Sequence, residues 1–324
     1  MKVGVIGVGY LGKFHAQKYA AIEGVELVGV ADVDTVAAES VAKANNCAAF
    51  SDYRQLLKEV DAVSVVVPTS QHHAVALDCI EAGVDMLMEK PITTTLEEAD
   101  DIIGRAAERG LILQVGHLER FNPAVQAMEP SLTTPIFIES QRISTFKSRG
   151  VDVDVVLDLM IHDIDIILNI IKSPLQTIHT VGAPVVTDFT DIANARLIFE
   201  NGATANVTVS RISRTNSRRM RIFQPGALIH VDFANRKVMT VNLKKGEFQE
   251  NGMPKQDVVV RSFPEGDALN SEIMHFVENV RNRTRPLVSG DEGRRALDVA
   301  LQVMKQIGEH LKLGVYAEMM SAEK

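Results

Sequence analysis

The sequence predicts an α/β protein with two domains: a doubly wound parallel sheet over residues 1–120 and an α+β domain with a large open, mainly antiparallel sheet over residues 121–324. In the first part, short runs rich in Val, Ile and Leu alternate with amphipathic helical segments. This alternation is typical of a parallel sheet that helices cover on both faces. After residue 120 the hydrophobic pattern changes mostly to period two, which indicates antiparallel strands with one buried face.

Composition excludes several classes of protein. The chain has 324 residues, of which 46% are hydrophobic and 23% charged, so two folded domains are expected. Its formal net charge of −8 argues against a nucleic-acid or anionic-membrane partner, because both require a basic surface. The two cysteines, Cys47 and Cys79, lack metal-ligand spacing, so no metal is expected. With no leader and no run of membrane-spanning length, we expect a cytoplasmic protein.

The expected elements of the first domain follow from the apolar runs and the helical segments between them. The strands are expected at 2–8, 25–31, 62–68, 84–89 and 111–116, and the helices at 13–24, 34–46, 72–83 and 94–110. Several of these helices close with Gly or Asn, which are common helix C-terminal residues.

The first turn carries a glycine motif, GVGYLG, that ends a strand and begins a helix. Gly7 would allow the tight turn, Gly9 the close approach of a pyrophosphate to the backbone, and Gly12 close helix packing. Asp32 ends the second strand, twenty residues after Gly12, where it would accept hydrogen bonds from the adenosine ribose. Because a carboxylate there repels a 2′-phosphate, the motif predicts a Rossmann domain that binds NAD rather than NADP.

Two further stretches belong at the carboxyl edge of this sheet, where ligands bind. In VVPTSQHH, Pro68 and Thr69 end a strand, and His72 either contacts the nicotinamide ribose or completes a helix cap. In MEKP, Lys90 follows an apolar strand and precedes Pro91. Whether the Lys90–Pro91 bond is cis is left open, and a solvated lysine is the alternative to a functional one.

The second domain is expected to form one large sheet. Period-two segments occur at 135–145, 176–183, 194–200, 204–213, 219–225, 227–233, 236–243 and 257–263, with helices at 154–172 and 270–282. The 154–172 helix would pack on one face of the sheet. The other face requires cover, which predicts a partner subunit.

The helix at 157–168, LDLMIHDIDIIL, is apolar apart from a narrow polar stripe. At about 100° per residue, Asp158, His162, Asp165 and Asn169 fall on one side. Asp163 lies off the stripe. The stripe is either a thin solvent-exposed edge or the lining of a pocket.

Basic residues cluster in SRISRTNSRRMR, which contains Arg211, Arg214, Arg218, Arg219 and Arg221. Guanidinium groups suit bidentate binding of a diphosphate, and a solvated hairpin is the alternative. In a strand, Arg219 and Arg221 share one face and Arg218 takes the other.

The ordered motifs GVIGVGYLG, VPTSQHHAVALDCIEAG, EKP, GHLERFNPA and DLMIHDID together resemble the glucose-fructose oxidoreductase, inositol dehydrogenase and MocA family. The resemblance covers nearly the whole chain, to RPLVSGDEGRRALDVAL at 285–301. It implies a Rossmann domain followed by a domain whose open sheet often forms the oligomer contact, here in a homodimer or homotetramer. The sequences at 116–124 and 157–167 are similar to those of the family branch that oxidises UDP-N-acetylglucosamine at its 3-hydroxyl.

The resemblance also implies roles for individual residues. Lys90 matches the lysine of the family's EKP motif, and Asp158 and His162 match the acid and histidine of its catalytic helix. Cofactor contacts are expected from Gly7, Gly9, Tyr10, Leu11, Gly12, Asp32, Pro68, Thr69, His72, Glu89 and Lys90. Substrate contacts are expected from Arg120, Asn122, Asp165, Arg211, Arg219 and Arg221. The chain departs from the family in the lead GVDVDVV at 150–156 and at Met160, where Gly is common.

The implied reaction is oxidation of a sugar secondary hydroxyl by hydride transfer to NAD. His162 or Lys90 takes the hydroxyl proton, Asp158 orients the imidazole, and Lys90 stabilises alkoxide charge. A same-family dehydrogenase for an inositol, a free sugar or a small carbonyl compound is one alternative. A non-catalytic NAD-binding regulator is another.

Overall fold

The computed structural model describes residues 1–146 and 153–313, and its contacts divide the chain into two compact units. Unit 1 contains residues 1–121 and 267–297, and unit 2 contains residues 122–266 and the described chain from residue 298. The sequence placed one boundary at residue 120. In the structure the chain returns to unit 1 after residue 266, because the helix that follows supplies apolar side chains to the unit 1 core.

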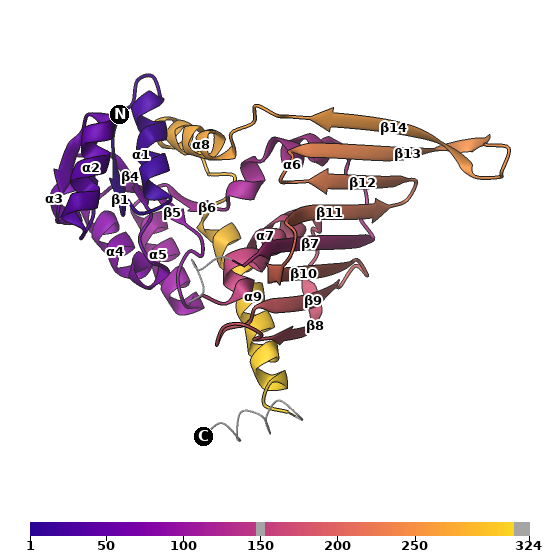
Figure 1. Ribbon diagram of the computed structural model, residues 1–324. Coiled ribbons are helices and arrows are strands. Elements are labelled where there is room, and N and C mark those ends of the chain that lie inside the picture. The colour runs from indigo at the N-terminus through magenta and orange to yellow at the C-terminus, as the bar shows by residue number, and fades with distance from the viewer. Residues whose placement is uncertain (147–152, 314–324) are drawn as a thin grey trace. The chain divides into compact units, whose positions relative to one another are not determined.

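Unit 1 is built on a six-stranded sheet in the order β3-β2-β1-β4-β5-β6 (Figure 1). All its neighbouring strands run parallel. The strands are β1 (Lys2–Ile6), β2 (Glu26–Ala31), β3 (Ala48–Phe50), β4 (Ala62–Val65), β5 (Asp85–Glu89) and β6 (Leu113–Gly116). This order reverses between β1 and β4, which is where doubly wound sheets bind dinucleotides. The short β3 is the one strand of this sheet that the sequence analysis did not anticipate.

Capping residues fix the ends of several helices of unit 1. They are α1 (Gly12–Ala21), α2 (Thr35–Asn45), α3 (Tyr53–Leu56), α4 (His72–Ala82), α5 (Leu96–Glu108) and α8 (Ala268–Asn282), with short 3-10 turns η1 (Thr69–Gln71) and η2 (Leu118–Phe121). Asp34 caps α2, and Thr95 with Glu98 forms a capping box on α5. Gly83 ends α4 in the left-handed conformation.

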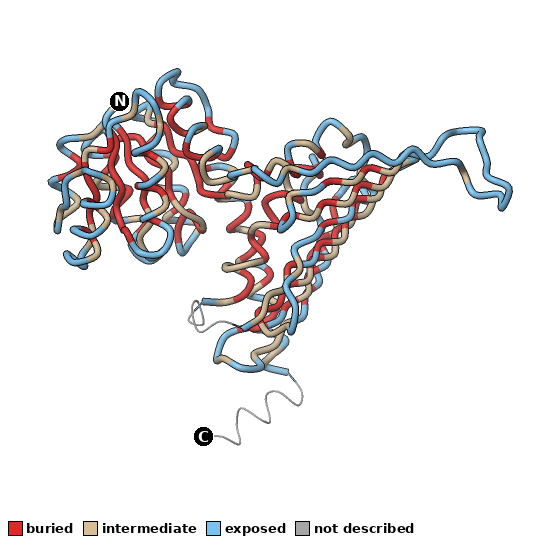
Figure 2. Tube along the Cα trace, turned by 45° about the horizontal axis from the view of Figure 1, so that its top comes forward, coloured by how far each residue is buried: buried red, intermediate tan, exposed pale blue. Residues whose placement is uncertain are grey.

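The core of unit 1 joins the sheet to α1 and α8. Val3, Val5 and Val30 from the strands pack in one buried cluster with Tyr19 of α1 and Phe276 of α8. The central strands are almost entirely buried (Figure 2), as expected when helices cover both faces.

Unit 2 is built on an eight-stranded sheet in the order β14-β13-β12-β11-β7-β10-β9-β8. Its strands are β7 (Phe137–Thr145), β8 (Leu175–Ala183), β9 (Ile192–Phe199), β10 (Thr204–Ser213), β11 (Ser217–Gln224), β12 (Ala227–Asp232), β13 (Lys237–Phe248) and β14 (Pro254–Ser262). Neighbours are antiparallel except β7 and β10, which are parallel. The expected fold class is confirmed in both units.

Helices lie on one face of this second sheet. They include α6 (Pro123–Met128), the 3-10 turn η3 (Glu129–Ser131), the π-helical turn η4 (Val156–Met160), α7 (Ile161–Ile170) and part of α9 (Gly290–His310). The long α9 was not anticipated as a helix. No helix within residues 1–146 and 153–313 has the length and apolar character needed to cross a membrane.

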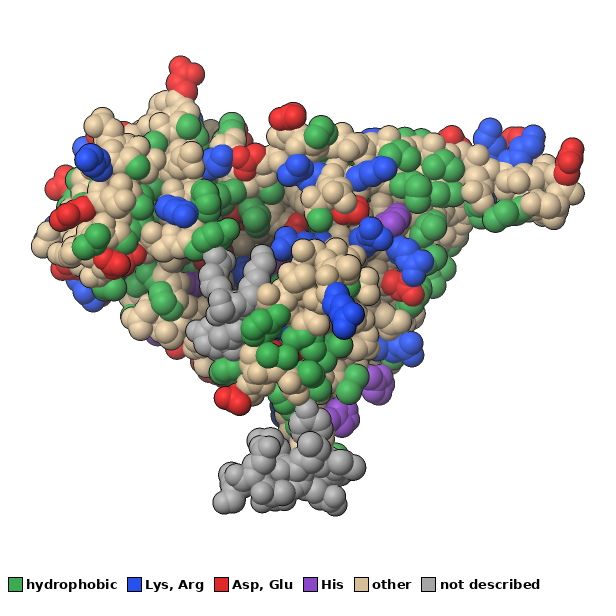
Figure 3. All heavy atoms as spheres, in the orientation of Figure 1, with side chains coloured by type: hydrophobic (Ala, Val, Ile, Leu, Met, Phe, Trp, Pro, Cys, Tyr) green, Lys and Arg blue, Asp and Glu red, His purple; other side chains and the backbone are tan. Residues whose placement is uncertain are grey.

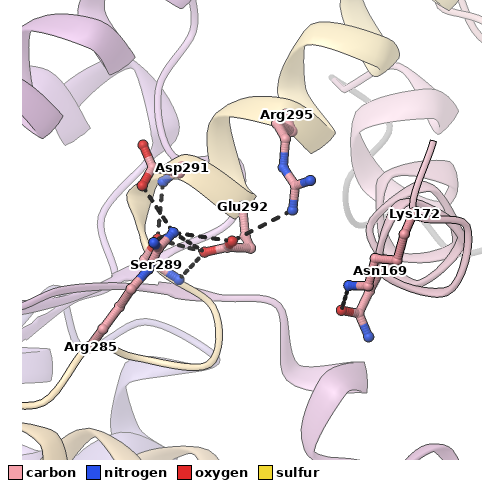
Figure 4. A network of polar contacts seen from close by, with 7 residues as sticks. All are labelled: Asn169, Lys172, Arg285, Ser289, Asp291, Glu292 and Arg295. Atoms are coloured by element: carbon pink, nitrogen blue, oxygen red, sulfur yellow. Dashed lines mark hydrogen bonds and ion pairs between the residues drawn. The ribbon is translucent and has the colours of Figure 1, made fainter. Parts of the chain in front are cut away.

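A polar cluster in unit 1 fixes the start of α9 (Figure 4). The Ser289 backbone N–H donates to Glu292 at 2.9 Å, and the Ser289 hydroxyl accepts from the Asp291 N–H at 3.3 Å. Arg285 donates to both Ser289 and Asp291. This reciprocal capping explains why the helix begins at Gly290.

Candidate active site

The glycine turn after β1 has the geometry that its sequence predicts. Gly7 has φ +85°, and a Cβ there would lie 2.5 Å from the Val66 carbonyl oxygen. A Cβ on Gly12 would lie 1.9 Å from the Gly7 carbonyl oxygen. By contrast, a Cβ on Gly9 would meet no described atom within 4 Å. The protein itself therefore requires Gly7 and Gly12, whereas Gly9 leaves open space where a pyrophosphate would approach.

Asp32 is held at the end of β2 by backbone hydrogen bonds. One carboxylate oxygen accepts from the Val8 N–H of the glycine turn at 2.7 Å, and the other accepts from the Asp34 N–H at 3.0 Å. The carboxylate is partly exposed. Each oxygen keeps a further lone pair for a ribose hydroxyl.

The first turn of α1 suits an anionic ligand. Within the described chain, no side chain caps this helix and its first turn has no acidic residue, so the positive end of the helix dipole is not offset locally. Tyr10 and Leu11, beside it, are 56% and 39% exposed. The open space at Gly9, the oriented Asp32 and this helix terminus together fit a dinucleotide such as NAD.

The structure gives His72 a structural role. Pro68 precedes the turn η1, and the His72 ring behind it is 1% exposed. One ring nitrogen lies 2.9 Å from the Pro91 carbonyl oxygen and the other lies 3.0 Å from that of Val67. Burial lowers the pKa of this imidazole, against the opposing effect of the carbonyls. The expected ribose contact is therefore corrected: both ring nitrogens already face the backbone, and His72 ties the loop after β4 to the loop after β5.

The EKP segment follows β5, and its Lys90–Pro91 bond is cis. Glu89 accepts from His15 Nε2 at 3.2 Å, and its other oxygen lies 3.3 Å from the Lys90 N–H. Burial alone would raise the pKa of Glu89, but His15 and Lys90 together lower it below its usual range. Glu89 is thus a carboxylate that His15 holds beside Lys90.

The sequence analysis missed the buried polar network behind Glu89. His15 Nδ1 lies 3.0 Å from the Ser64 hydroxyl, which lies 2.9 Å from the Tyr19 hydroxyl. His15, Ser64 and Tyr19 are all fully buried. One signal was available: His15 and Tyr19 are four residues apart, so they share the inward face of α1.

Glu272 of α8 is a second carboxyl near Glu89. Its side chain is fully buried, and neither oxygen has a hydrogen-bond partner among the described residues. Burial, reinforced by the negative charge of Glu89, raises its pKa well above the usual value. Glu272 therefore keeps its proton to a higher pH than an exposed glutamate does.

In unit 2, the predicted polar stripe begins in a π-helical turn rather than in a regular helix. The Ile161 N–H bonds back to the Val156 carbonyl, five residues earlier. Asp158 lies in this turn, and His162 and Asp165 lie on α7. Asp165 is 3% exposed, and Asp158 and His162 are partly buried. Such turns are rare and often occur at functional sites. The lead at 150–156 lies partly outside the described residues.

Asp163, off the stripe, fixes α7 to the sheet. Its carboxylate accepts from Arg142 Nε at 2.8 Å and from the Ser140 hydroxyl at 2.8 Å. Arg142 and Asp163 are 2% and 0% exposed. The sequence analysis missed Arg142, since only the pairing of strand and helix shows that this arginine is buried.

Arg211 is not placed as a diphosphate ligand. It is 6% exposed, and it contacts Asp191 at 3.3 Å and the Thr190 carbonyl at 3.0 Å. Burial would raise the pKa of Asp191, but three backbone N–H groups and Thr187 outweigh it and lower that pKa. Arg211 therefore stabilises the loop at 184–191, which corrects its expected substrate role.

Arg219 and Arg221 lie on the sheet face opposite α7. They pair across the strands with Gln141 and Glu139, whereas α7 covers the face that carries Ser140 and Arg142. Arg219 contacts Asp232 at 3.5 Å, and Arg221 forms an ion pair with Glu139. They line a polar hollow of about 450 Å³ together with His230. The sequence placed them with the stripe residues, but strand alternation puts them on the other side.

Arg120 and Asn122 are both buried. Arg120 lies in η2 and is 3% exposed. Asn122 caps α6 through its carbonyl oxygen, and its amide donates to the Phe233 carbonyl at 3.1 Å. Its side chain therefore has a structural role in unit 2.

Comparison with known proteins agrees with this geometry. A family model for oxidoreductases with an NAD-binding Rossmann fold matches residues 1–117, and one for the GFO/IDH/MocA C-terminal domain matches residues 138–229. The chain belongs to the GFO/IDH/MocA oxidoreductase family. It is thus an NAD-binding oxidoreductase, and the expected family, enzyme class and cofactor are confirmed.

Individual relatives cover nearly the whole chain. It is 42% identical to a UDP-N-acetylglucosamine 3-dehydrogenase of Acidithiobacillus ferrooxidans over 94% of this chain and 96% of that one. A solved structure of that enzyme matches with a TM-score of 0.88, covering 95% of this chain and 97% of the other. A scyllo-inositol 2-dehydrogenase of Bacillus subtilis is 26% identical over 93% of this chain and 92% of that one.

Proposed function

We propose that this protein oxidises the 3-hydroxyl of a UDP-N-acetylhexosamine with NAD as acceptor. The observation that carries the proposal is the 42% identity to a UDP-N-acetylglucosamine 3-dehydrogenase across almost the full length of both chains. The match spans 304 residues, or 94% of this chain, and so includes most of both units. Inositol dehydrogenases that match over comparable lengths are less similar, at 23–26%.

Three residues carry the proposed chemistry. His162 accepts the proton of the reacting hydroxyl, Asp158 orients the imidazole from the preceding turn, and Lys90 stabilises the developing alkoxide charge. Bound NAD supplies the acceptor for the hydride. Glu89, held by His15 at 3.2 Å, keeps a negative charge beside Lys90. Lys90 as the base, with His162 as the charged group, is the alternative assignment.

The proposed cofactor contacts are the glycine turn, Tyr10, Leu11, Asp32, Pro68, Thr69, Glu89 and Lys90. Substrate contacts are proposed from Asp165 and Arg120, both of which are buried polar groups. The hollow at Arg219 and Arg221 is not included, because it lies on the face opposite α7.

We also propose a cytoplasmic homodimer or homotetramer, with the open face of the unit 2 sheet as the contact. That face carries Arg219, Arg221 and His230 and has no helix of unit 2 against it among the described residues. Self-association would cover it symmetrically. Analytical ultracentrifugation tests the oligomer, and cell fractionation tests the location.

The test is an assay of NAD reduction at 340 nm with a carbonyl trap. The purified protein is mixed with NAD and, in separate reactions, UDP-N-acetylglucosamine, UDP-N-acetylgalactosamine, free N-acetylglucosamine, glucose and myo-inositol. Reduction confined to the UDP-sugars supports the proposal. If NAD is reduced only with an inositol or a free sugar, the protein is a dehydrogenase with that compound as its substrate. If NAD is not reduced with any of these compounds although the protein binds NADH, the result favours the NAD-binding regulator.

A further inference from the structure

The outermost strand of unit 2, β14, is unusually exposed for a strand rich in valine. It lies at the edge of the eight-stranded sheet, where β13 is its one neighbour among the described strands. Val258, Val259 and Val260 are 50%, 38% and 50% exposed. Figure 2 shows β13 and β14 continuing into an exposed hairpin, and Figure 3 shows hydrophobic side chains along it. Exposed apolar strand edges bind other strands.

The exposed valines lie on both faces of the sheet. Val259 pairs with Thr240, whose face is buried, whereas Val258 and Val260 pair with Val241 and Met239 on the other face. A partner that packed on one face would cover only alternate valines. A strand added at the edge would lie beside all three.

The usual protection against strand pairing lies outside the valine segment of this edge. Pro254 and Lys255 are at the hairpin end of β14, and the irregularity of the β13–β14 ladder is also there, between Leu243 and Phe248, whereas residues 257–261 contain no lysine or proline. The opposite edge strand, β8, is different. There Gln306 of α9 donates to the Ile178 carbonyl at 3.0 Å, so a helix already binds that strand.

The sequence of the exposed edge is complementary to itself. Residues 257–261 read Asp-Val-Val-Val-Arg. If two copies ran antiparallel about a two-fold axis at Val259, Asp257 of each would face Arg261 of the other. Val258 would face Val260, and Val259 would face its own counterpart. Opposite charges and β-branched pairs directly across a ladder both stabilise it.

We propose that β14 pairs antiparallel with β14 of a second copy of this chain, in the register centred on Val259. The two sheets then become one continuous sheet across a closed two-fold interface. An unrelated strand would not be expected to place a positive charge opposite Asp257 and a negative charge opposite Arg261. This contact is distinct from the open-face contact, and it does not depend on the substrate.

Cysteine crosslinking tests the register. In a Cys47→Ala background, Val259→Cys places two thiols directly opposite each other, with Cβ atoms about 4.5–5.5 Å apart. The matched control is Val181→Cys, on the other edge strand, where valine is 61% exposed. Mild oxidation at micromolar protein should convert most of the Val259→Cys chain to a covalent dimer on non-reducing gels. Yields equal to the Val181→Cys control would overturn the proposal.

Charge exchange tests the same register without cysteine. Asp257→Arg or Arg261→Asp alone puts like charges opposite each other at both ends and should lower the crosslinking yield of Val259→Cys about tenfold. The double variant Asp257→Arg, Arg261→Asp restores both pairs and should restore the yield to within about twofold. Arg261 also donates to the Ala127 carbonyl at 3.4 Å, so thermal melting of each variant checks that unit 2 stays folded. Failure of the double variant to recover while it remains folded would contradict the register.

Discussion

At the scale of single residues, Lys90 and His162 carry the proposed proton and charge chemistry. Replacing either one, as Lys90→Met or His162→Ala, should lower kcat by about 10²–10⁴, the range for loss of a positioned acid, base or charge. NADH binding, followed by fluorescence, should change little for His162→Ala because its imidazole is assigned to the hydroxyl proton. Near-normal turnover of both variants would contradict the mechanism.

Asp32 is expected to select NAD over NADP. Asp32→Ala should raise the KM for NAD about tenfold, because charged hydrogen bonds to the ribose contribute roughly 1.5–3 kcal/mol, and it should reduce the preference against NADP. The matched control is Asp34→Ala, since Asp34 caps α2 through the Val36 and Ala37 N–H groups and should affect stability alone. Steady-state kinetics with both cofactors decides, and an unchanged KM for NAD in Asp32→Ala would refute this assignment.

Glu272 should make unit 1 less stable as pH rises. Its pKa is raised by burial and by Glu89, so the folded chain keeps a proton that the unfolded chain releases above about pH 4.5. Stability is therefore lost progressively from that pH up to the raised pKa. Glu272→Gln removes this loss, and it should raise the melting temperature more at pH 8 than at pH 5. Each 1 kcal/mol corresponds to roughly 2–4 °C.

The control is Glu278→Gln, an exposed glutamate on the same helix, which should leave the pH dependence unchanged. A Glu272→Gln variant that melts lower than the parent at pH 8 would show that Glu272 is ionised in the folded protein.

The residues that sequence reasoning found are those with a local signal. Gly7, Gly12 and Asp32 stand at fixed spacings in a strand-turn-helix, and the structure gives each glycine the steric reason that the spacing predicts. Glu272 and Arg142 have no such signal, because the groups around them come from distant segments and only the packed fold makes them buried polar groups. His15 has only its four-residue spacing from Tyr19. The sequence correctly associated His72 with the loop after β4, but its ring nitrogens face backbone carbonyls rather than a ligand.

At the scale of elements, the ion pair of Arg142 with Asp163 determines how α7 sits on the sheet. Arg142→Met leaves a buried carboxylate without its cation and should destabilise the protein by about 3–5 kcal/mol. Arg142→Met combined with Asp163→Asn should recover a large part of that loss. Urea unfolding followed by circular dichroism measures both. Arg105→Met, which removes an exposed ion pair with Asp101, is the control, because such pairs contribute little; an equal loss there would contradict the assignment.

The regular elements were predictable because hydrophobic period and burial coincide. The strands of both sheets appear near their expected positions, and Asn46 and Gly83 end helices as their types suggest. The short β3 has too few residues for a period to show. The amphipathic period of α9 does predict a helix, but its segment at 285–301 was interpreted only as a family motif. The π-helical turn at 156–160 could not be predicted, since it depends on how the chain enters α7.

At the scale of the whole molecule, the sequence correctly predicted a Rossmann sheet followed by an open sheet, and the family follows from motifs spread along the chain. It did not predict that residues 267–297 return to unit 1. The sequence of an amphipathic helix shows that one face is apolar, but it does not show against which core that face packs. The arginine cluster was misread for a related reason. These arginines lie close together in the sequence. In the structure Arg211 is buried, whereas strand alternation puts Arg219 and Arg221 on the open face of the sheet.

The most direct test of the proposed function is the fate of the hydrogen on C3 of the sugar. UDP-N-acetylglucosamine deuterated at C3 is incubated with the protein, NAD and a carbonyl trap, and the NADH formed is analysed by mass spectrometry. Oxidation at C3 predicts one deuterium in the reduced nicotinamide and a 3-keto sugar in the trap. Unlabelled NADH from this substrate, or a deuterium that stays on the sugar, would contradict oxidation at C3.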